Sequence, residues 1–303
     1  MAKQTVEIVE VGPRDGFQNL PEFLPTEKKL DVIGQLINAG VRHIQITSFV
    51  SPKAIPQMRD ATEVAAACLA RWPELDLLAL VPNFRGAQSA AEAGLKKVTN
   101  VISLSASHNR ANINRTHDES FAELARIHTE LPQLELCLDV ATAFGCPFEG
   151  KYREVEPLLA FLQRGRDIGV EHFVLCDTVG LADPAQVRRF LIACRQQLPG
   201  IRLDVHIHDT RGMGLANSLA AIESGADAVQ STLGGLGGCP FAPGASGNTA
   251  TEDLVFMLNE MGYDTGIDFA ALLAAAKSCL TSVPGVYSGH HIHIEKSTLC
   301  TLC

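Results

Sequence analysis

The stretch "INAGVRHIQI", residues 37–46, places a small residue and a glycine between a helix-like segment and an apolar run. Glycine suits the left-handed turn that closes a helix, and β-branched residues in the following apolar run favour a buried strand. The same order of features recurs at "AEAGLKKVTNVISL" (91–104), "RDIGVEHFVL" (166–175) and "IESGADAVQS" (222–231). This recurrence predicts a repeating helix–turn–strand unit.

Extended along the chain, the pattern predicts eight strands, each followed by a helix. The strands are expected at 6–11, 42–47, 75–81, 97–104, 134–141, 171–175, 202–207 and 227–231. The helices are expected at 26–39, 61–71, 84–93, 117–130, 152–168, 184–197, 212–223 and 249–260, with another at 267–281. This alternation predicts an α/β protein with a (β/α)₈ TIM barrel as a single domain over 1–283 and a short tail at 284–303. A doubly wound sheet is the alternative, but no G-x-G-x-x-G turn follows the first strand.

Composition narrows the classes of partner. The 303 residues are 46% hydrophobic and carry a formal charge of -9, so we expect no nucleic-acid partner, because the basic surface for one is missing. No apolar run is long enough to span a bilayer, and the N-terminus lacks the apolar core of a secretion signal, so we expect a cytoplasmic protein without membrane contact.

Nine cysteines, an odd number without zinc-knuckle spacing, fit a reducing compartment. We interpret Cys300 and Cys303 as inert tail thiols rather than a redox pair.

Two histidines stand out in "LDVHIHDTRG", residues 203–212, at the end of a predicted strand. Residues two apart in a strand point to the same side, so His206 and His208 can reach one ion. Asp15 lies at the end of the first predicted strand, and the carboxyl ends of barrel strands meet at one face. Two imidazoles and a carboxylate suit Mg²⁺ or Mn²⁺, with Co²⁺ or Zn²⁺ as alternatives. A structural or surface role for the two histidines is the simpler alternative.

Two further features lie at predicted strand ends. Arg14 precedes Asp15 in "GPRDGFQN", where it could polarise a carbonyl or neutralise an enolate, although these residue types also form turns. The loop "GGLGGCPFAPGASGN" (234–248) carries six glycines around Cys239. Such glycine density favours a loop that lies close to a ligand or closes over it, rather than a merely floppy connection.

Six motifs together resemble one family. They are "VEIVEVGPRDGFQN" (6–19), "TSFVSPKAIPQM" (47–58), "AFGCPFEGK" (143–151), "DTVGLADP" (177–184), "VHIHDT" (205–210) and "GGLGGCPFAPGASGNTATEDLVFML" (234–258). In this order they are similar to the 3-hydroxy-3-methylglutaryl-CoA lyases, metal-dependent enzymes on a (β/α)₈ barrel. The resemblance covers about residues 5 to 281 and identifies the chain as a divergent member.

The resemblance implies a set of roles. The metal ligands would be Asp15, His206, His208 and Asn248. The catalytic residues would be Arg14, Cys239, Asp177 and His206, with Arg14 on the substrate carbonyl and Cys239 linked to proton transfer. The substrate-binding residues would be Gln45, Ser48 and Arg211. The implied reaction is a retro-aldol cleavage of a 3-hydroxyacyl-CoA to an acyl-CoA and a keto acid, in the parent family acetyl-CoA and acetoacetate. Relatives associate through their barrel exteriors, so a homodimer or higher homo-oligomer is expected.

The chain departs from the family pattern around this pocket. Gln45 stands where these lyases carry a glutamate, which removes one charge beside Arg14. Arg211 stands in place of a tyrosine, Val174 in place of a serine, and Leu20 and Pro21 in place of an acid and a lysine. These changes predict an acyl group that differs from the parent one, such as a citramalyl-CoA-like thioester with a carboxylate for Arg211. A lyase acting on a free hydroxy or 2-oxo acid and a non-catalytic metabolite-binding relative are the other hypotheses.

Overall fold

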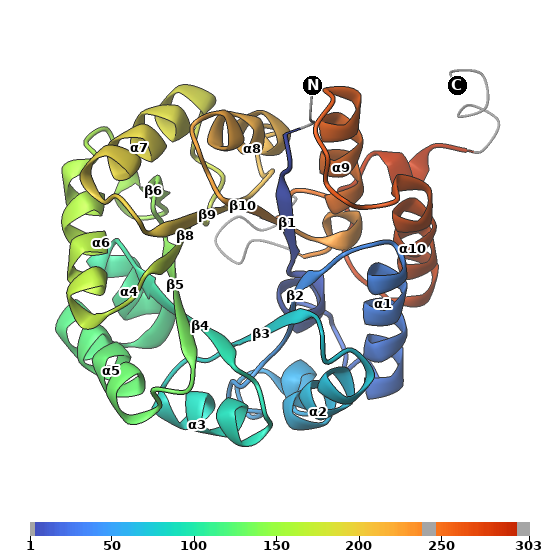
Figure 1. Ribbon diagram of the computed structural model, residues 1–303, viewed down its shortest axis with the longest axis horizontal. Helices are drawn as coiled ribbons and strands as arrows, with labels where there is room; N and C mark the ends of the chain where they lie inside the picture. The colour runs from blue at the N-terminus through green and yellow to red at the C-terminus, as the bar shows by residue number, and fades with distance from the viewer. Residues whose placement is uncertain (1–3, 238–246, 296–303) are drawn as a thin grey trace.

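The computed structural model describes residues 4–237 and 247–295, and in these ranges eight parallel strands close into a barrel (Figure 1). The barrel strands are β1 (Glu7–Glu10), β2 (His43–Ser48), β3 (Asp76–Leu80), β4 (Lys97–Ser103), β5 (Glu135–Ala141), β8 (His172–Asp177), β9 (Arg202–Ile207) and β10 (Ala228–Ser231). Around the barrel they follow the order β1-β10-β9-β8-β5-β4-β3-β2. The predicted barrel is therefore confirmed, and all eight expected strands are present.

Helices surround the barrel on its outside, as Figure 1 shows. They are α1 (Thr26–Asn38), α2 (Ala61–Arg71), α3 (Phe84–Glu92), α4 (Ala106–Ile113), α5 (His117–Glu130), α6 (Glu156–Ile168), α7 (Pro184–Gln197), α8 (Gly214–Glu223), α9 (Thr251–Glu260) and α10 (Phe269–Ser282). Single helical turns are η1 (Gly12–Gly16), η2 (Pro56–Met58), η3 (Leu233–Gly235) and η4 (His291–His293). None of the helices in the described ranges is long and apolar enough to cross a membrane.

The main hydrophobic core lies between the strands and the helices. On β9, Leu203, Val205 and Ile207 belong to this core. The alternate residues of the strand, including His206, therefore point into the barrel, because successive strand side chains face opposite sides. Burial of this outer layer stabilises the barrel and leaves the interior positions for polar side chains. The six described cysteines, Cys68, Cys137, Cys146, Cys176, Cys194 and Cys279, are free and buried.

Two segments differ from the sequence-based expectation. Helix α4 occupies a stretch between the predicted strand at 97–104 and the predicted helix at 117–130, where no helix was predicted. It forms because the Ser105 hydroxyl accepts a hydrogen bond from the N–H of His108 at 3.0 Å and caps it. The helix ends at Asn114, which adopts a left-handed φ of 53°. Helix α6 begins at Glu156 rather than residue 152, because a short hairpin of β6 (Gly145–Cys146) and β7 (Gly150–Lys151) precedes it.

Charged side chains close the amino-terminal end of the barrel. Arg202 at the start of β9 pairs with Glu7 of β1 and, through Nε at 3.1 Å, with Asp204 Oδ1. On β8, His172 Nε2 lies 2.7 Å from Asp204 Oδ2. A second group of charged side chains joins β2, β3 and β4. Asp76 Oδ2 of β3 lies 3.0 Å from Lys97 Nζ of β4 and 3.0 Å from His43 Nδ1 of β2. We call these seven residues the floor ring. They link the strands at the end opposite the predicted site.

Candidate metal centre and active-site cavity

Arg14 and Asp15 lie in η1, a single π-helical turn directly after β1. Their backbone N–H groups both donate to the carbonyl oxygen of Val11, at 3.0 and 2.7 Å. The Glu10 carboxylate holds the start of the turn, since its Oε1 accepts the N–H of Gly12 at 2.8 Å. Isolated π-helical turns are frequent at functional sites. The turn places both side chains in the wall of an interior cavity.

Glu10 also anchors the chain after β10. Its Oε1 accepts the N–H of Leu233 at 2.9 Å, and its Oε2 accepts the hydroxyl of Thr251 at 2.6 Å. Glu252 beside it accepts the N–H of Gly234 at 2.8 Å through Oε2, while its Oε1 is buried without a hydrogen-bond partner in residues 4–237 and 247–295. Burial raises the pKa of Glu10 to about 7 and that of Glu252 to about 8. These two acids fix the turns around the mouth of the barrel by hydrogen bonds rather than by charge.

His206 and His208 point into the barrel together. Their Nε2 atoms lie 3.1 Å apart, and both rings are buried. The other ring nitrogen of His206, Nδ1, lies 3.1 Å from Oε1 of Gln230, which is its neighbour in register on β10. An amide oxygen only accepts, so Nδ1 carries the proton and the Nε2 lone pair of His206 faces the site. The sequence-based prediction that the two imidazoles share one side of the strand is confirmed.

Asn248 completes this group from beside His208. Its Nδ2 donates to Asp15 Oδ2 at 2.8 Å and to the carbonyl oxygen of Leu236 at 3.2 Å. Its Oδ1 is buried and has no hydrogen-bond partner among the described residues. Gly237, at a φ of +132°, lets the amide lie against the backbone, because a Cβ there would be 2.6 Å from Asn248 Nδ2. The backbone of Asn248 also bridges to His208 in antiparallel fashion.

The donor set fits a divalent cation. One ligand atom each from Asp15, His206 and His208 lies within 4.8 Å of the others. Burial lowers the pKa of His206 to about 3 and also lowers that of His208, so both rings are neutral. Burial alone would raise the pKa of Asp15, but the Arg14 guanidinium and the other neighbours of the carboxylate together outweigh it, and the pKa falls to about 2. A carboxylate, two neutral imidazoles and the unpaired Asn248 oxygen are the ligand types of a Mg²⁺ or Mn²⁺ site.

A cavity of about 360 Å³ opens beside this donor set at the carboxyl ends of the strands. Its lining combines the predicted site with apolar side chains and further polar groups: Arg14, Asp15, Gln18, Asn19, Val50, Ile55, Leu80, Pro82, Val101, His108, Asn112, Ile113, Asp139, Ala141, Cys176, Thr178, His206 and His208. Its size and mixed lining are those of a small-molecule site.

Arg14 is held in place by its neighbours. Its Nε donates to Gln45 Oε1 and its Nη1 donates to Asp15 Oδ1. Gln45 is fully buried, and its Nε2 has no hydrogen-bond partner in the part of the chain that the structure describes. The hydrogen bond keeps the guanidinium pointed at the cavity, but the amide supplies no negative charge. The expected loss of an ionic partner for Arg14 at Gln45 is therefore visible in the geometry.

The remaining predicted residues lie in different surroundings. Ser48, at the end of β2, is buried, and its hydroxyl has no hydrogen-bond partner among the residues that the structure describes, but it is absent from the cavity lining. Asp177 is turned toward the backbone, where its carboxylate accepts the N–H groups of Leu181 and Ala182. Burial raises the pKa of Asp177 to about 6. The structure therefore gives Asp177 a turn-stabilising contact and does not bring it into the cavity.

Arg211 also stays outside the cavity wall. Its exposed side chain donates from Nη1 to the carbonyl oxygens of Val179 and Gly180, at 2.7 and 3.0 Å. The expected contact between Arg211 and a substrate carboxylate gains no support from this placement. Cys239, the predicted loop cysteine, lies outside the described residues, as do Cys300 and Cys303.

Among the polar residues of the site that were not predicted from the sequence, two stand out. Gln230 orients His206, and Asp139 of β5 lines the cavity while it is 3% exposed. Both interrupt apolar strands, in "ADAVQS" (226–231) and "ELCLDVA" (135–141). A polar side chain within a buried strand was the available signal in each case.

A (β/α)₈ barrel with a carboxylate and two imidazoles gathered at the carboxyl ends of its strands defines a metal-dependent barrel enzyme. Comparison with known families places it further. The HMGL-like family model matches residues 5–279, and the chain belongs to this family. The resemblance to this family that the six sequence motifs indicated is thereby confirmed.

The chain is similar along nearly its whole length to characterised lyases. It is 42% identical to the hydroxymethylglutaryl-CoA lyase YngG of Bacillus subtilis over 90% of this chain and 91% of that protein. It is also 42% identical to the (R)-citramalyl-CoA lyase of Chloroflexus aurantiacus, over 90% of this chain and 89% of that protein. Among solved structures, an HMG-CoA lyase from Acinetobacter baumannii in complex with coenzyme A and 3-methylmalate is 43% identical with a TM-score of 0.86, covering 91% of this chain and 90% of that one.

Proposed function

We propose that this protein is a divalent-cation-dependent carbon–carbon lyase that cleaves a 3-hydroxyacyl-CoA thioester into an acyl-CoA and a keto acid. The observation that carries the proposal is the buried group of Asp15, His206 and His208 beside the unpaired Asn248 oxygen, at the wall of a ligand-sized cavity. A divalent cation held by these four residues would act as a Lewis acid toward the hydroxyl and carbonyl oxygens of the substrate. The similarity to two CoA-thioester lyases supports this reaction class.

Arg14 supplies the fixed positive charge of the reaction. Gln45 and Asp15 hold its guanidinium, so little reorganisation is needed when charge develops on the substrate. When the bond between C2 and C3 breaks, its electron pair passes into the acyl-CoA enolate. Arg14 donates hydrogen bonds to the thioester oxygen, where the enolate charge gathers. The apolar cavity wall, including Leu80 and Val101, excludes water from this carbanion-like group.

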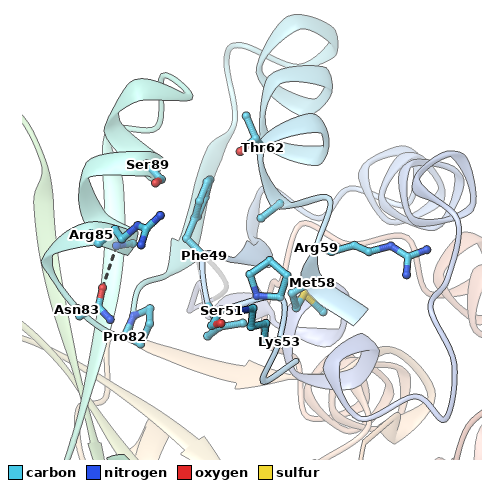
Figure 2. A pocket seen from close by; sticks show the side chains of 14 residues that line it. Phe49, Ser51, Lys53, Met58, Arg59, Thr62, Pro82, Asn83, Arg85 and Ser89 are labelled. Atoms are coloured by element: carbon cyan, nitrogen blue, oxygen red, sulfur yellow. Dashed lines mark hydrogen bonds between the residues drawn. The ribbon is translucent and has the colours of Figure 1, made fainter. Parts of the chain in front are cut away.

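A second hollow can receive the CoA portion. It measures about 700 Å³ and shares Val50 and Pro82 with the cavity lining (Figure 2). Lys53 enters it from the loop after β2, and Arg85 enters it from α3. Arg59 points away and lies over the Phe23 ring, with Cζ 3.7 Å from the centroid. We therefore assign the nucleotide phosphates to Lys53 and Arg85, which are exposed cations next to the acyl cavity.

A citramalyl-CoA-like thioester is the second candidate substrate. It is one methylene shorter than 3-hydroxy-3-methylglutaryl-CoA, and the chain is as similar to the (R)-citramalyl-CoA lyase as to YngG. The observation that favours it is Gln45, whose buried Nε2 is an unused donor beside Arg14. An extra donor in place of a carboxylate favours a substrate that presents another anionic oxygen at this point. This preference rests on Gln45 and no longer on Arg211.

The test is cleavage by metal-stripped protein that has been reloaded with Mn²⁺, with acyl-CoA products measured by mass spectrometry. The panel holds 3-hydroxy-3-methylglutaryl-CoA, citramalyl-CoA and free citramalate. We expect cleavage of a thioester, and its loss in His208→Ala, while the exposed control variant His128→Ala keeps the activity. Cleavage of free citramalate alone would favour the lyase without CoA. Mn²⁺ binding without any cleavage would favour the non-catalytic relative.

A further inference from the structure

Asp139 is a buried acid of the cavity for which the reaction above has no use. It lies on β5, four strands away from β1 and therefore across the barrel from Asp15. Its Oδ1 accepts the hydroxyl of Thr99 at 2.8 Å, and no other hydrogen bond to its carboxylate forms within residues 4–237 and 247–295. The side chain is 3% exposed and lines the same cavity as His206. Its second oxygen, Oδ2, is thus left for a ligand in the cavity.

The surroundings of Asp139 are otherwise poor in partners. In strand register it lies beside Val101 of β4 and Val174 of β8. Val174 is one of the positions where the chain departs from the lyase pattern, and an apolar side chain there gives the acid nothing to bind. A buried carboxylate with one hydrogen bond leaves most of its accepting capacity unused, which is costly unless a ligand uses it. The arrangement therefore fits a group that works on the substrate rather than one that only braces the fold.

We propose that Asp139 is the proton shuttle of the cleavage, a catalytic residue that contacts the substrate from β5, across the barrel from Asp15. This inference rests on the proposed function. Asp139 Oδ2 accepts the proton of the substrate C3 hydroxyl, the C3–O bond becomes the ketone carbonyl, and the electron pair of the C2–C3 bond forms the enolate. Asp139 then returns the same proton to C2 and completes the acyl-CoA. Hydroxyl oxygen and C2 are both attached to C3, so one carboxylate can serve both, and protons and electrons balance without a co-reactant.

The charges facing Asp139 suit a group that both takes up and releases a proton. Burial raises the pKa of Asp139 to about 6, while Arg14, the Thr99 hydrogen bond and His172 act in the opposite direction. Asp15, the other carboxylate that acts on it, raises the pKa further. The buried thiols of Cys137 and Cys176 have raised pKa values and are neutral neighbours. A shuttle works best when its pKa lies near the working pH.

The first test replaces the carboxylate without changing its shape. In Asp139→Asn the Thr99 hydrogen bond can persist, so the fold and the Mn²⁺ affinity measured by calorimetry should match those of the wild type. We expect kcat to fall by about 10²- to 10⁴-fold, the usual contribution of general acid–base catalysis, while KM changes by less than about threefold. A structural role would instead lower the melting temperature and leave kcat largely intact.

The second test moves the pKa without touching the acid. Thr99→Val removes the hydrogen bond that lowers the pKa of Asp139, so the acidic limb of kcat/KM should move to higher pH. Thr99→Ser keeps a hydroxyl and is the matched control, whose limb should stay in place. An Asp139→Asn variant within threefold of the wild-type kcat, or an unmoved limb in Thr99→Val, would overturn the shuttle alone. A wild-type protein that cleaves none of the thioesters would overturn the proposed function and this inference with it.

Discussion

Gln230 offers the sharpest probe of the metal centre, because its side chain would act on a bound cation only through His206. Its Oε1 lies 3.1 Å from His206 Nδ1, and both side chains are buried. Gln230→Met keeps the size of the side chain and removes the acceptor. The buried N–H of His206 would then be unpaired, at a cost of about 1–3 kcal/mol. The ring can avoid this cost by moving its proton to Nε2, which blocks the ligand atom.

The expected result is a weaker metal site in an intact fold. A cost of this size corresponds to a roughly 10- to 100-fold loss of Mn²⁺ affinity, in the range known for residues that orient metal ligands. Calorimetric titration of metal-stripped protein with Mn²⁺ measures it directly. Gln230→Glu is the matched control, since its carboxylate still accepts from Nδ1 and should hold the affinity near or above the wild-type value. Equal affinities for wild type and Gln230→Met would refute the assignment of Gln230 as the residue that orients His206.

Three further perturbations follow from the geometry. Gln45→Glu supplies a carboxylate for Arg14, so the ratio of kcat/KM for 3-hydroxy-3-methylglutaryl-CoA to kcat/KM for citramalyl-CoA should rise about tenfold. This is the effect of one charge-assisted hydrogen bond worth about 1.4 kcal/mol. An unchanged ratio would show that this position does not select the acyl group. Burial raises the pKa of Glu252 in the folded state from 4.5 to about 8. The contribution of Glu252 to the free energy of unfolding is therefore complete below pH 4.5 and is lost as the pH rises to about 8. At pH 7 the loss amounts to about 3 kcal/mol. Urea unfolding from pH 5 to 8 should therefore show a shallower decline in Glu252→Gln, and parallel curves for the two proteins would contradict it. Lys29→Met should lower the free energy of unfolding by about 3–5 kcal/mol in the same assay. The substitution leaves Asp60, whose Oδ1 lies 2.5 Å from Lys29 Nζ, as an uncompensated buried charge. A loss below about 1 kcal/mol would argue against a stabilising buried pair.

The barrel was predictable because its signals are local. Each glycine turn, such as those at Gly40 and Gly169, closes a helix at a positive φ and leads directly into a buried strand. Helix α4 escaped prediction because its sequence has no apolar periodicity, and a single hydroxyl cap on Ser105 starts it. The hairpin of β6 and β7 has two residues a side and leaves little trace in a sequence.

The site was predictable as far as strand ends determine it. Asp15, His206 and His208 meet because the carboxyl ends of all the strands converge, which needs no knowledge of side-chain packing. Gln230 and Asp139 depend on which strands are neighbours and on register, and a sequence read strand by strand does not contain that order. The roles of these two residues could therefore be recognised only in the closed barrel.

The floor ring has a consequence for how such a molecule can diversify. Arg202, Asp204, Lys97 and Asp76 join strands at the amino-terminal end, away from the cavity, so the energy that holds this end together does not depend on what the opposite loops contain. Loops at the mouth can then accumulate substitutions that alter chemistry without loosening the scaffold. New specificities can be selected at one end of this molecule while the other keeps it foldable.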